Sequence, residues 1–302
     1  MSDATTVGRL EGAADTGGPL TTRRRVNLAW LGLVPFFAFV GLFLLWPALA
    51  SVAGSLWDDG FTTDNMRRAM SPPYSQAFAT SIRLSVITAV LGGVIGTALA
   101  YAITILERPR WVRSAMTAWS GVAANLGGVP LAFAFLAAFG TQGLATRLLN
   151  EVGFDLVGAG FRLSELSGLV LVYLYFQIPL MLLVMAPAID GLRPTWREAA
   201  TGLGATPTRY WLNVGFPILL PSLMGGFLLL FANAFSAYAT AYSLTGGQAN
   251  IVPLQIRFVL QGNTITGEGD LGNALAAWMI AIMAVAVVAN VVLQKRTSKW
   301  LQ

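Results

Sequence analysis

The fold is decided by residues 166–217, which read LSGLVLVYLYFQIPLMLLVMAPAIDGLRPTWREAATGLGATPTRYWLNVGFP. The first part, 166–189, carries no charge, and about 20 apolar residues suffice to cross the hydrocarbon core of a bilayer as a helix. The second part, 190–217, turns polar and holds Arg193, Arg197 and Arg209. An uncharged segment followed by an arginine-rich loop predicts a transmembrane helix that ends on the cytoplasmic side.

The composition of the whole chain agrees with a membrane protein. Of 302 residues, 55% are hydrophobic and only 11% are charged, whereas soluble domains usually contain about 25% charged residues. We therefore expect an all-α membrane protein, a polytopic bundle of about six transmembrane helices. The expected spans are residues 28–50, 80–105, 115–140, 166–189, 218–243 and 273–294.

The first expected span has an alternative interpretation. Arg23, Arg24 and Arg25 precede it, as positive residues precede a secretory signal. Its apolar run is longer than a signal's apolar region, however, and no small-residue cleavage site follows cleanly. We expect a retained membrane anchor.

Arginine and lysine fall in alternate loops, which predicts the topology. The loops that hold them are expected in the cytoplasm, so both termini lie inside, whereas the opposite loops are mildly acidic and hold few arginines, among them Arg257. The expected parts are a flexible cytoplasmic tail (1–25), a transmembrane domain (26–296) with the loop 190–217, and a short cytoplasmic tail (297–302). In the outer segment 141–165, the spacing of Leu144, Leu148, Leu149 and Val152 predicts a short amphipathic helix.

Several functions are excluded by residues that the chain lacks. It has no cysteine and no histidine, which removes disulfides, thiol nucleophiles, imidazole bases and the usual zinc sites. Its two lysines, Lys295 and Lys299, lie outside any G-x-x-x-x-G-K-[ST] loop, so no phosphate-binding P-loop is present. Its basic residues gather at span ends, which is not the pattern of nucleic-acid binding. We expect no enzyme activity, no metal and no cofactor in this chain.

The loop 190–217 has local signals for two short helices. Thr195 followed by Glu198 predicts a capping box at the start of the first helix. Gly202 or Gly204 is expected to end that helix with a positive φ. Thr206 followed by Pro207 predicts a second helix start, before Pro217 opens the next span.

The alanines of this loop leave a smooth surface. Ala199 and Ala200 would let another protein approach closely, where a solvated loop would normally carry polar side chains. The local chemistry leaves a second interpretation equally open, in which Glu198 caps a helix and nothing docks.

A family resemblance separates these two interpretations. The loop is similar to the EAA loop of permease subunits in bacterial ATP-binding-cassette (ABC) importers, with matching spacing at Glu198, Ala199, Ala200, Gly204, Val214 and Pro217 and with Phe216 in place of the usual leucine. The number of spans, the inside termini and the position of the loop agree. The stretch 231–247, with Pro253 and Leu254, resembles permeases grouped with putative spermidine/putrescine importers more than those of sugar importers.

The resemblance implies a type I importer permease fold in a bacterial inner membrane and a division of labour. A soluble extracytoplasmic binding protein would deliver the substrate, two permease subunits would form the path, and two copies of a cytoplasmic ATPase would bind ATP and Mg²⁺. We expect the second permease to be a paralogue and the substrate to be a polyamine or another small polar solute, with iron, thiamine, phosphonate, sugar and peptide cargoes open. The residues expected to couple to the ATPase are Thr195, Glu198, Ala199, Ala200, Gly204, Pro207, Val214 and Pro217.

The substrate path is harder to predict. Polar residues inside spans usually face protein or water, so they are candidates either for lining a path or for packing between helices. The candidates are Asn125, Tyr173, Gln177, Asn233, Ser236, Tyr238, Thr240 and Tyr242.

An ion-coupled secondary transporter or a channel subunit is the alternative function. Such proteins generally need an ionisable residue near the bilayer centre. In this chain every Asp and Glu lies in a loop or at a span end, and Arg83 is the only charge placed even a few residues into an expected span. The sequence therefore favours the permease.

Overall fold

The computed structural model describes residues 32–57, 60–105, 110–261 and 269–298. Within these ranges the chain is helical, apart from turns and an isolated bridge between Trp57 and Phe61. Six helical segments of the described chain are long and apolar enough to cross a membrane, as the sequence predicts. Contacts divide the chain into two units, Met1–Pro47 and Ala48–Gln302, and each is described by itself.

The described part of the first unit belongs to the first candidate span, Val34–Leu56. This span consists of α1 (Val34–Val40), a π-helical turn (Gly41–Leu45) and α2 (Trp46–Leu56). Its residues are almost all apolar, as a membrane-spanning helix requires. Residues 28–31 of the expected span lie outside the described residues.

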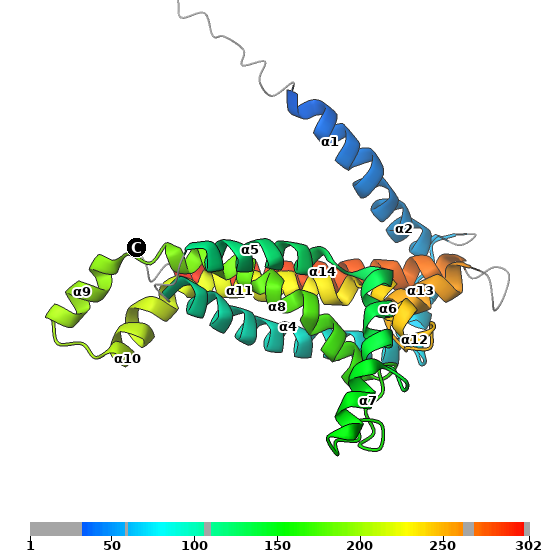
Figure 1. Cartoon of the computed structure of the whole chain (residues 1–302). Coiled ribbons are helices and arrows are strands. Elements are labelled where there is room, and N and C mark those ends of the chain that lie inside the picture. The colour runs from blue at the N-terminus through cyan, green and yellow to red at the C-terminus, as the bar shows by residue number, and fades with distance from the viewer. Residues whose placement is uncertain (1–31, 58–59, 106–109, 262–268, 299–302) are drawn as a thin grey trace, which may run out of the picture. The chain divides into compact units, whose positions relative to one another are not determined.

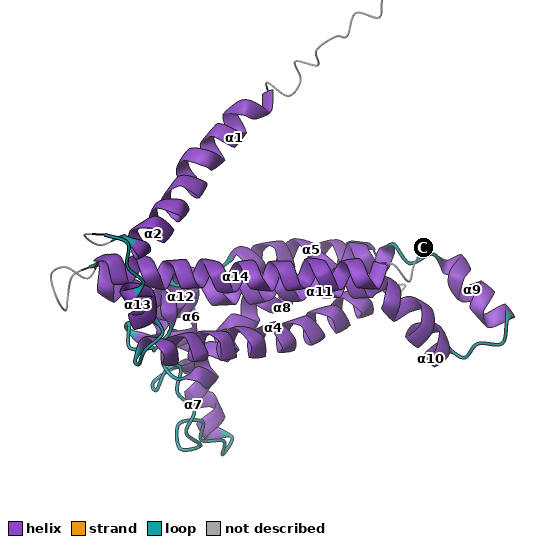
Figure 2. Cartoon of the chain, turned by 180° about the vertical axis from the view of Figure 1, so that it is seen from behind, coloured by secondary structure: helices purple, strands orange, loops and turns teal. Residues whose placement is uncertain are grey.

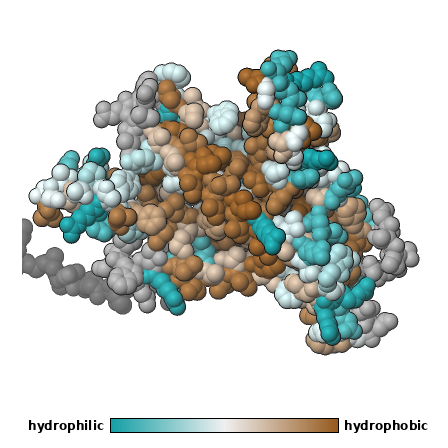
Figure 3. All heavy atoms as spheres, turned by 90° about the horizontal axis from the view of Figure 1, so that it is seen from below, coloured by the Kyte–Doolittle hydropathy of each residue, from teal (hydrophilic) through white to brown (hydrophobic). Residues whose placement is uncertain are grey.

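The second unit is built around five long helices that lie side by side in both views (Figures 1 and 2). These are α4 (Tyr74–Ile105), α5 (Arg110–Asn125), α8 (Leu166–Asp190), α11 (Phe216–Ser236) and α14 (Gly269–Ser298). Helix α8 contacts α4, α5 and α11 and carries the largest buried share of the candidate spans. The face seen in Figure 3 is apolar over its middle and hydrophilic toward its two ends, as a bilayer requires.

Small residues bring α4, α8 and α11 close together. A Cβ atom on Gly96 of α4 would lie 2.6 Å from the Cβ of Met181 and 2.7 Å from the carbonyl oxygen of Ile178, both in α8. A Cβ on Gly226 of α11 would lie 2.6 Å from the sulfur of the same Met181. Close backbone approach at small residues is a main source of helix association in membranes.

Two of the expected spans are wrong as single helices. Within 115–140, α5 ends at Asn125 and α6 (Gly128–Phe139) turns across the end of the bundle (Figures 1 and 2). Gly128 adopts φ +73°, a conformation that glycine favours and that a continuous helix excludes. Within 218–243, α11 ends at Ser236 and α12 (Ala239–Thr245) follows.

The third crossing therefore differs from its expected position. By length and apolarity the third candidate span is Gly128–Glu151, because α6 is strongly apolar. The helix that runs alongside the bundle is instead α5, and α6 meets α12 at the bundle's end (Figure 1).

Three short helices complete the end of the bundle where α6 and α12 lie. They are α3 (Asp64–Ala69), α7 (Leu144–Glu151) and α13 (Val252–Leu260). Helix α7 confirms the short amphipathic helix predicted within 141–165, and its Leu144 and Leu148 are exposed.

Candidate functional site

The loop 190–217 projects beyond the bundle as α9 (Pro194–Gly202) followed by α10 (Pro207–Tyr210), as Figure 1 shows. Helix α9 has no buried residue. Trp196 keeps 37% of its surface exposed, and Leu203, just after the helix, keeps 89%. Tertiary packing normally supplies most of the stability of a helix. Because α9 is exposed, it gains little stability from packing against the rest of this chain.

The turn that terminates α9 is made by Gly204, one of the two predicted glycines. Gly204 adopts φ +78°, and its N–H donates to the carbonyl of Thr201 at 2.9 Å. The N–H of Ala205 donates to the carbonyl of Ala200, also at 2.9 Å. This pair of bonds is a Schellman motif, which turns the chain sharply and satisfies two carbonyls that the helix end leaves free.

The predicted capping box at the start of α9 is wrong. The N-cap is Arg193, whose side chain makes no capping bond, and Thr195 lies inside the first turn. Pro194 explains the difference: a proline favours the first helical position, and the residue before it is held extended. The Arg193 guanidinium instead lies 5.9 Å from the ring centre of Trp196, a cation–π contact.

The predicted start at Thr206 is confirmed, but the helix that follows is continuous with a span. The Thr206 hydroxyl oxygen accepts a bond from the N–H of Arg209 at 3.3 Å, and Pro207 occupies the first turn. Helix α10 then passes through a π-helical turn, η3 (Trp211–Gly215), directly into α11. The second half of the loop is therefore a rigid extension of a transmembrane helix.

Aromatic contacts anchor this extension to the bundle. Tyr210 is buried, and Trp211 meets Tyr101 of α4 edge to face at 5.1 Å. On the other side of the loop, Arg113 of α5 pairs with Asp190 at the end of α8. Both groups of that pair are partly exposed, so the pair adds little to the net stability of the fold. Its main effect is to hold two helix ends together.

The cap at Thr206 gives a local prediction. Thr206→Val should lower the free energy of unfolding of the loop by about 1 kcal/mol, because an N-terminal N–H loses its acceptor. Thr195→Val should change it far less, because the Thr195 side chain caps nothing. Amide hydrogen exchange over 194–215 measures both, and equal effects of the two changes would contradict this assignment of the caps.

Three of the eight path candidates are packing residues. Tyr173 is fully buried, and its hydroxyl donates to the carbonyl of Ala237 at 3.0 Å. Buried Thr240 accepts from the N–H of Gly128 at 2.7 Å. Gln177 is also fully buried, and its amide donates to the Thr88 hydroxyl at 2.9 Å. In this structure these side chains hold the helices together.

Tyr173 and Thr240 also hold the two helix breaks. Tyr173 binds the backbone where α11 ends, and Thr240 ties the start of α12 to the start of α6. The break between α5 and α6 therefore lies beside the break between α11 and α12.

The other five candidates remain accessible and gather at these breaks. Asn125 and Ser236, the last residues of α5 and α11, are exposed, whereas Asn233, Tyr238 and Tyr242 are partly buried. Irregular backbone at membrane depth is tolerated where it is covered by protein or lines a water-filled cavity. This surface is the candidate path on this chain.

One residue of this surface was not singled out from the sequence. Arg257 of α13 lies against Tyr238, the N-cap of α12, and Tyr242 of α12, and its guanidinium carbon is 3.9 Å from the ring centre of Tyr242. The sequence signal is the Gly246–Gly247 pair, which marks the turn between α12 and α13. Both glycines adopt positive φ, 61° and 85°.

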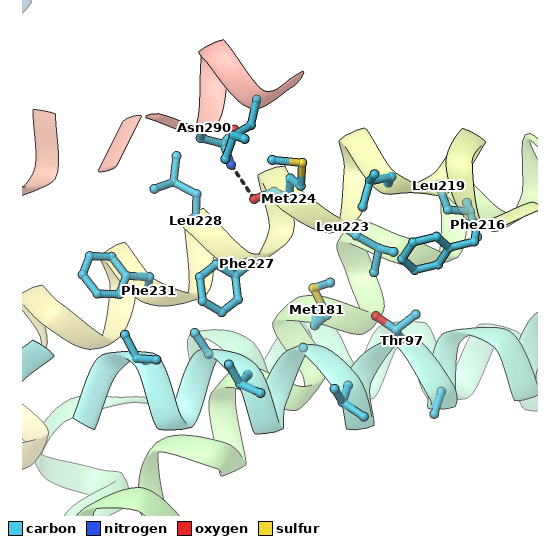
Figure 4. Close-up of a pocket in the computed structure, with 18 of the residues that line it drawn as sticks. Thr97, Met181, Phe216, Leu219, Leu223, Met224, Phe227, Leu228, Phe231 and Asn290 are labelled. Carbon is cyan, nitrogen blue, oxygen red and sulfur yellow. Dashed lines mark hydrogen bonds between the residues drawn. The ribbon is translucent and has the colours of Figure 1, made fainter. Parts of the chain in front are cut away.

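A large groove of the described chain lies elsewhere. It has a volume of about 1010 Å³ and runs between α4, α11 and α14 (Figure 4). Its lining is almost wholly apolar, and the amide of Asn290 is engaged by the carbonyl of Met224 at 2.7 Å. Such a lining suits lipid or another helix, and a polar solute would find few partners in it.

The chain is a polytopic α-helical membrane protein with an exposed helix, α9, beyond its bundle. Residues 92–299 match the family described as the binding-protein-dependent transport system inner membrane component. The chain belongs to this family and is a permease subunit of an ABC importer, a transport component and not an enzyme.

Individual relatives agree with the family. The chain is 24% identical over 221 residues to a probable sulfate transport system permease protein of Prototheca wickerhamii, covering 72% of this chain and 77% of that protein. It is 25% identical over 270 residues to the spermidine/putrescine transport system permease protein PotB of Haemophilus influenzae, covering 83% and 88%. A chain of a bacterial ABC transporter involved in alginate import has the same fold, with a TM-score of 0.70, 17% identity, and 89% and 95% coverage.

Proposed function

We propose that this chain forms half of a translocation path and docks through α9 onto a cytoplasmic ATPase. The observation that carries the proposal is the exposure of α9, a helix with no buried residue that nevertheless ends in a well-formed Schellman motif. Ala199 is exposed on this helix, and Glu198 is exposed beside it. A defined, uncovered helix fits a docking element whose partner is another protein.

The continuity of α10, η3 and α11 supports a route for coupling. When ATP closes the ATPase pair, α9 and α10 would move, and the helical extension would carry that movement along α11. At the other end of α11 lie Ser236 and the break that borders the candidate path. Val214 and Pro217 are half-buried in this extension and would transmit the movement without touching the ATPase.

The family membership supports a larger assembly as part of the proposal. We infer two ATPase copies that bind ATP and Mg²⁺, a second permease that is a paralogue, and an extracytoplasmic binding protein. A further solved relative is a bacterial alginate ABC transporter in complex with an alginate-bound periplasmic protein. Positive-inside loops support cytoplasmic termini in the bacterial inner membrane.

The substrate is proposed as a small polar solute. The names of similar proteins include sulfate, ferric, molybdenum, thiamine and spermidine/putrescine transport. A polyamine remains the candidate from the resemblance of residues 231–254.

Copurification tests the docking proposal. The tagged chain, extracted gently at native abundance, should bring down a P-loop ATPase and a second permease in stoichiometric amounts by mass spectrometry. Ala199→Arg should reduce the recovered ATPase at least tenfold, because a long charged side chain would stand on the docking face. Ala159→Arg, in the outer segment, is the matched control and should leave recovery unchanged.

Recovery of the wild-type chain alone, or as a simple self-oligomer, would contradict the docking proposal. The secondary-transporter or channel alternative would then be reopened.

A further inference from the structure

Arg257 is held in a fixed position by three neighbours. Its Nε donates to the Gln261 side chain at 2.9 Å, and a terminal nitrogen donates to the Tyr238 hydroxyl. The guanidinium carbon lies 3.9 Å from the centre of the Tyr242 ring, and the Tyr238 and Tyr242 rings stack at 5.6 Å. This arrangement is called the Arg257 cluster below.

The backbone explains why Arg257 meets two tyrosines that precede it by 15 and 19 positions. The chain turns at Gly246 and Gly247 after α12, and both glycines have positive φ. The N–H of Val252, the first residue of α13, then donates to the buried Ser81 hydroxyl of α4 at 2.9 Å. Helix α13 is thereby fixed to the bundle, and its arginine is presented to α12.

The cluster borders the candidate path. Tyr238 directly follows the break at the end of α11, next to exposed Ser236. Tyr238, Tyr242 and Arg257 are all partly exposed, so a solute in a water-filled path could reach them.

The chemistry of the cluster suits an anion. A guanidinium has five N–H donors, more than its bonds to the neighbouring side chains use. Arginine forks match carboxylate, sulfate and phosphate oxygens. Within the described residues no carboxylate pairs with Arg257; the described ion pairs join Arg113 to Asp190 and Arg162 to Glu165.

We propose that the Arg257 cluster is a path-facing site for an anionic group of the transported solute. This inference rests on the proposed permease function. It replaces the polyamine with an anionic solute as the substrate candidate, because a fixed cation attracts carboxylates or oxyanions and repels a polyamine. The two tyrosines keep the guanidinium in place, so that less side-chain conformational freedom is lost when an anion binds.

Thiol labelling tests the site without knowledge of the solute. The chain has no cysteine, so Ser236→Cys would introduce its single thiol. In membranes with the assembled complex, this thiol is reacted with an anionic (sulfonatoethyl) and a cationic (trimethylammonioethyl) methanethiosulfonate. Their rate ratio cancels the effect of the thiol's own reactivity and reports the local potential.

Arg257→Gln should lower the anionic-to-cationic rate ratio by at least about threefold, because the loss of one nearby positive charge slows the anionic reagent and speeds the cationic one. Arg257→Lys should keep most of the ratio, and Arg162→Gln, the control at a remote outer arginine, should leave it unchanged. A thiol that does not react, or a ratio that Arg257→Gln does not change, would overturn the proposal.

The same preparations separate the two proposals. If the ATPase copurifies but Arg257→Gln does not change the rate ratio, only the anion-site proposal is contradicted. If Arg257→Gln lowers the rate ratio but no ATPase copurifies, the docking proposal is contradicted and the Arg257 cluster remains a site that attracts anions.

Discussion

Replacing Gly204 with valine should reduce the copurifying ATPase, and ATP-driven uptake with it, by more than tenfold. Gly204 sits at φ +78° at the end of α9, where a β-branched residue is a conformational outlier and where strain costs about 1–3 kcal/mol. The chain would relieve this strain by giving up the bonds from Gly204 to Thr201 and from Ala205 to Ala200. The end of the proposed docking helix would then no longer hold its shape.

Gly202 provides the matched control. It lies inside α9, its φ is not in the left-handed region, and a Cβ there would meet no atom within 4 Å. Gly202→Ala should keep ATPase recovery at the wild-type level and should favour the helix slightly. Quantitative mass spectrometry of the purified complex measures both variants, and undiminished recovery with Gly204→Val would contradict the role of this turn.

Replacing Gly96 with valine should destabilise the bundle by about 3 kcal/mol, near the upper end of the usual cost of overpacking. A Cβ at this position would meet the Ile178 carbonyl at 2.7 Å and the Met181 Cβ at 2.6 Å. The carbonyl belongs to the backbone of α8, so it cannot move unless the helix moves. We expect a lower melting temperature and less monodisperse protein after extraction.

Gly93, one turn earlier on the same helix, is the control for this prediction. A Cβ there would meet no atom within 4 Å. Gly93→Val introduces the same side chain into α4 without forcing α8 away, so it should extract and melt nearly as the wild type does. Equal losses for Gly93→Val and Gly96→Val would show that a valine in α4, and not its contact with α8, is responsible.

The candidate loop was largely predictable because its signals are local. Gly204 and Thr206 act on neighbours within a few residues, and both behave as their residue types predict. The error at Thr195 is also local, because Pro194 competes for the helix start and takes it. The continuity of α10 with α11 was not predicted, because Pro217 was expected to begin the span. In the structure Pro217 lies in the first turn of α11, and α11 follows directly from η3.

The candidate path was predictable only as a set of residue types. Tyr173 and Tyr238 look alike in the sequence, yet one is fully buried and the other is accessible beside a helix break. Tyr173 lies on a face of α8 that packs inside the bundle, whereas Tyr238 lies where α11 has already ended.

By itself the sequence determined that this is a polytopic α-helical membrane protein, where most of its apolar segments lie, and which loop resembles a docking element. Those properties depend on composition and on residues close together in the chain. Only the tertiary structure decided where the third and fifth spans break, which polar side chains are buried, and that Arg257 meets two tyrosines. Those depend on contacts such as Gly128 with Thr240, 112 positions apart, which no local pattern encodes.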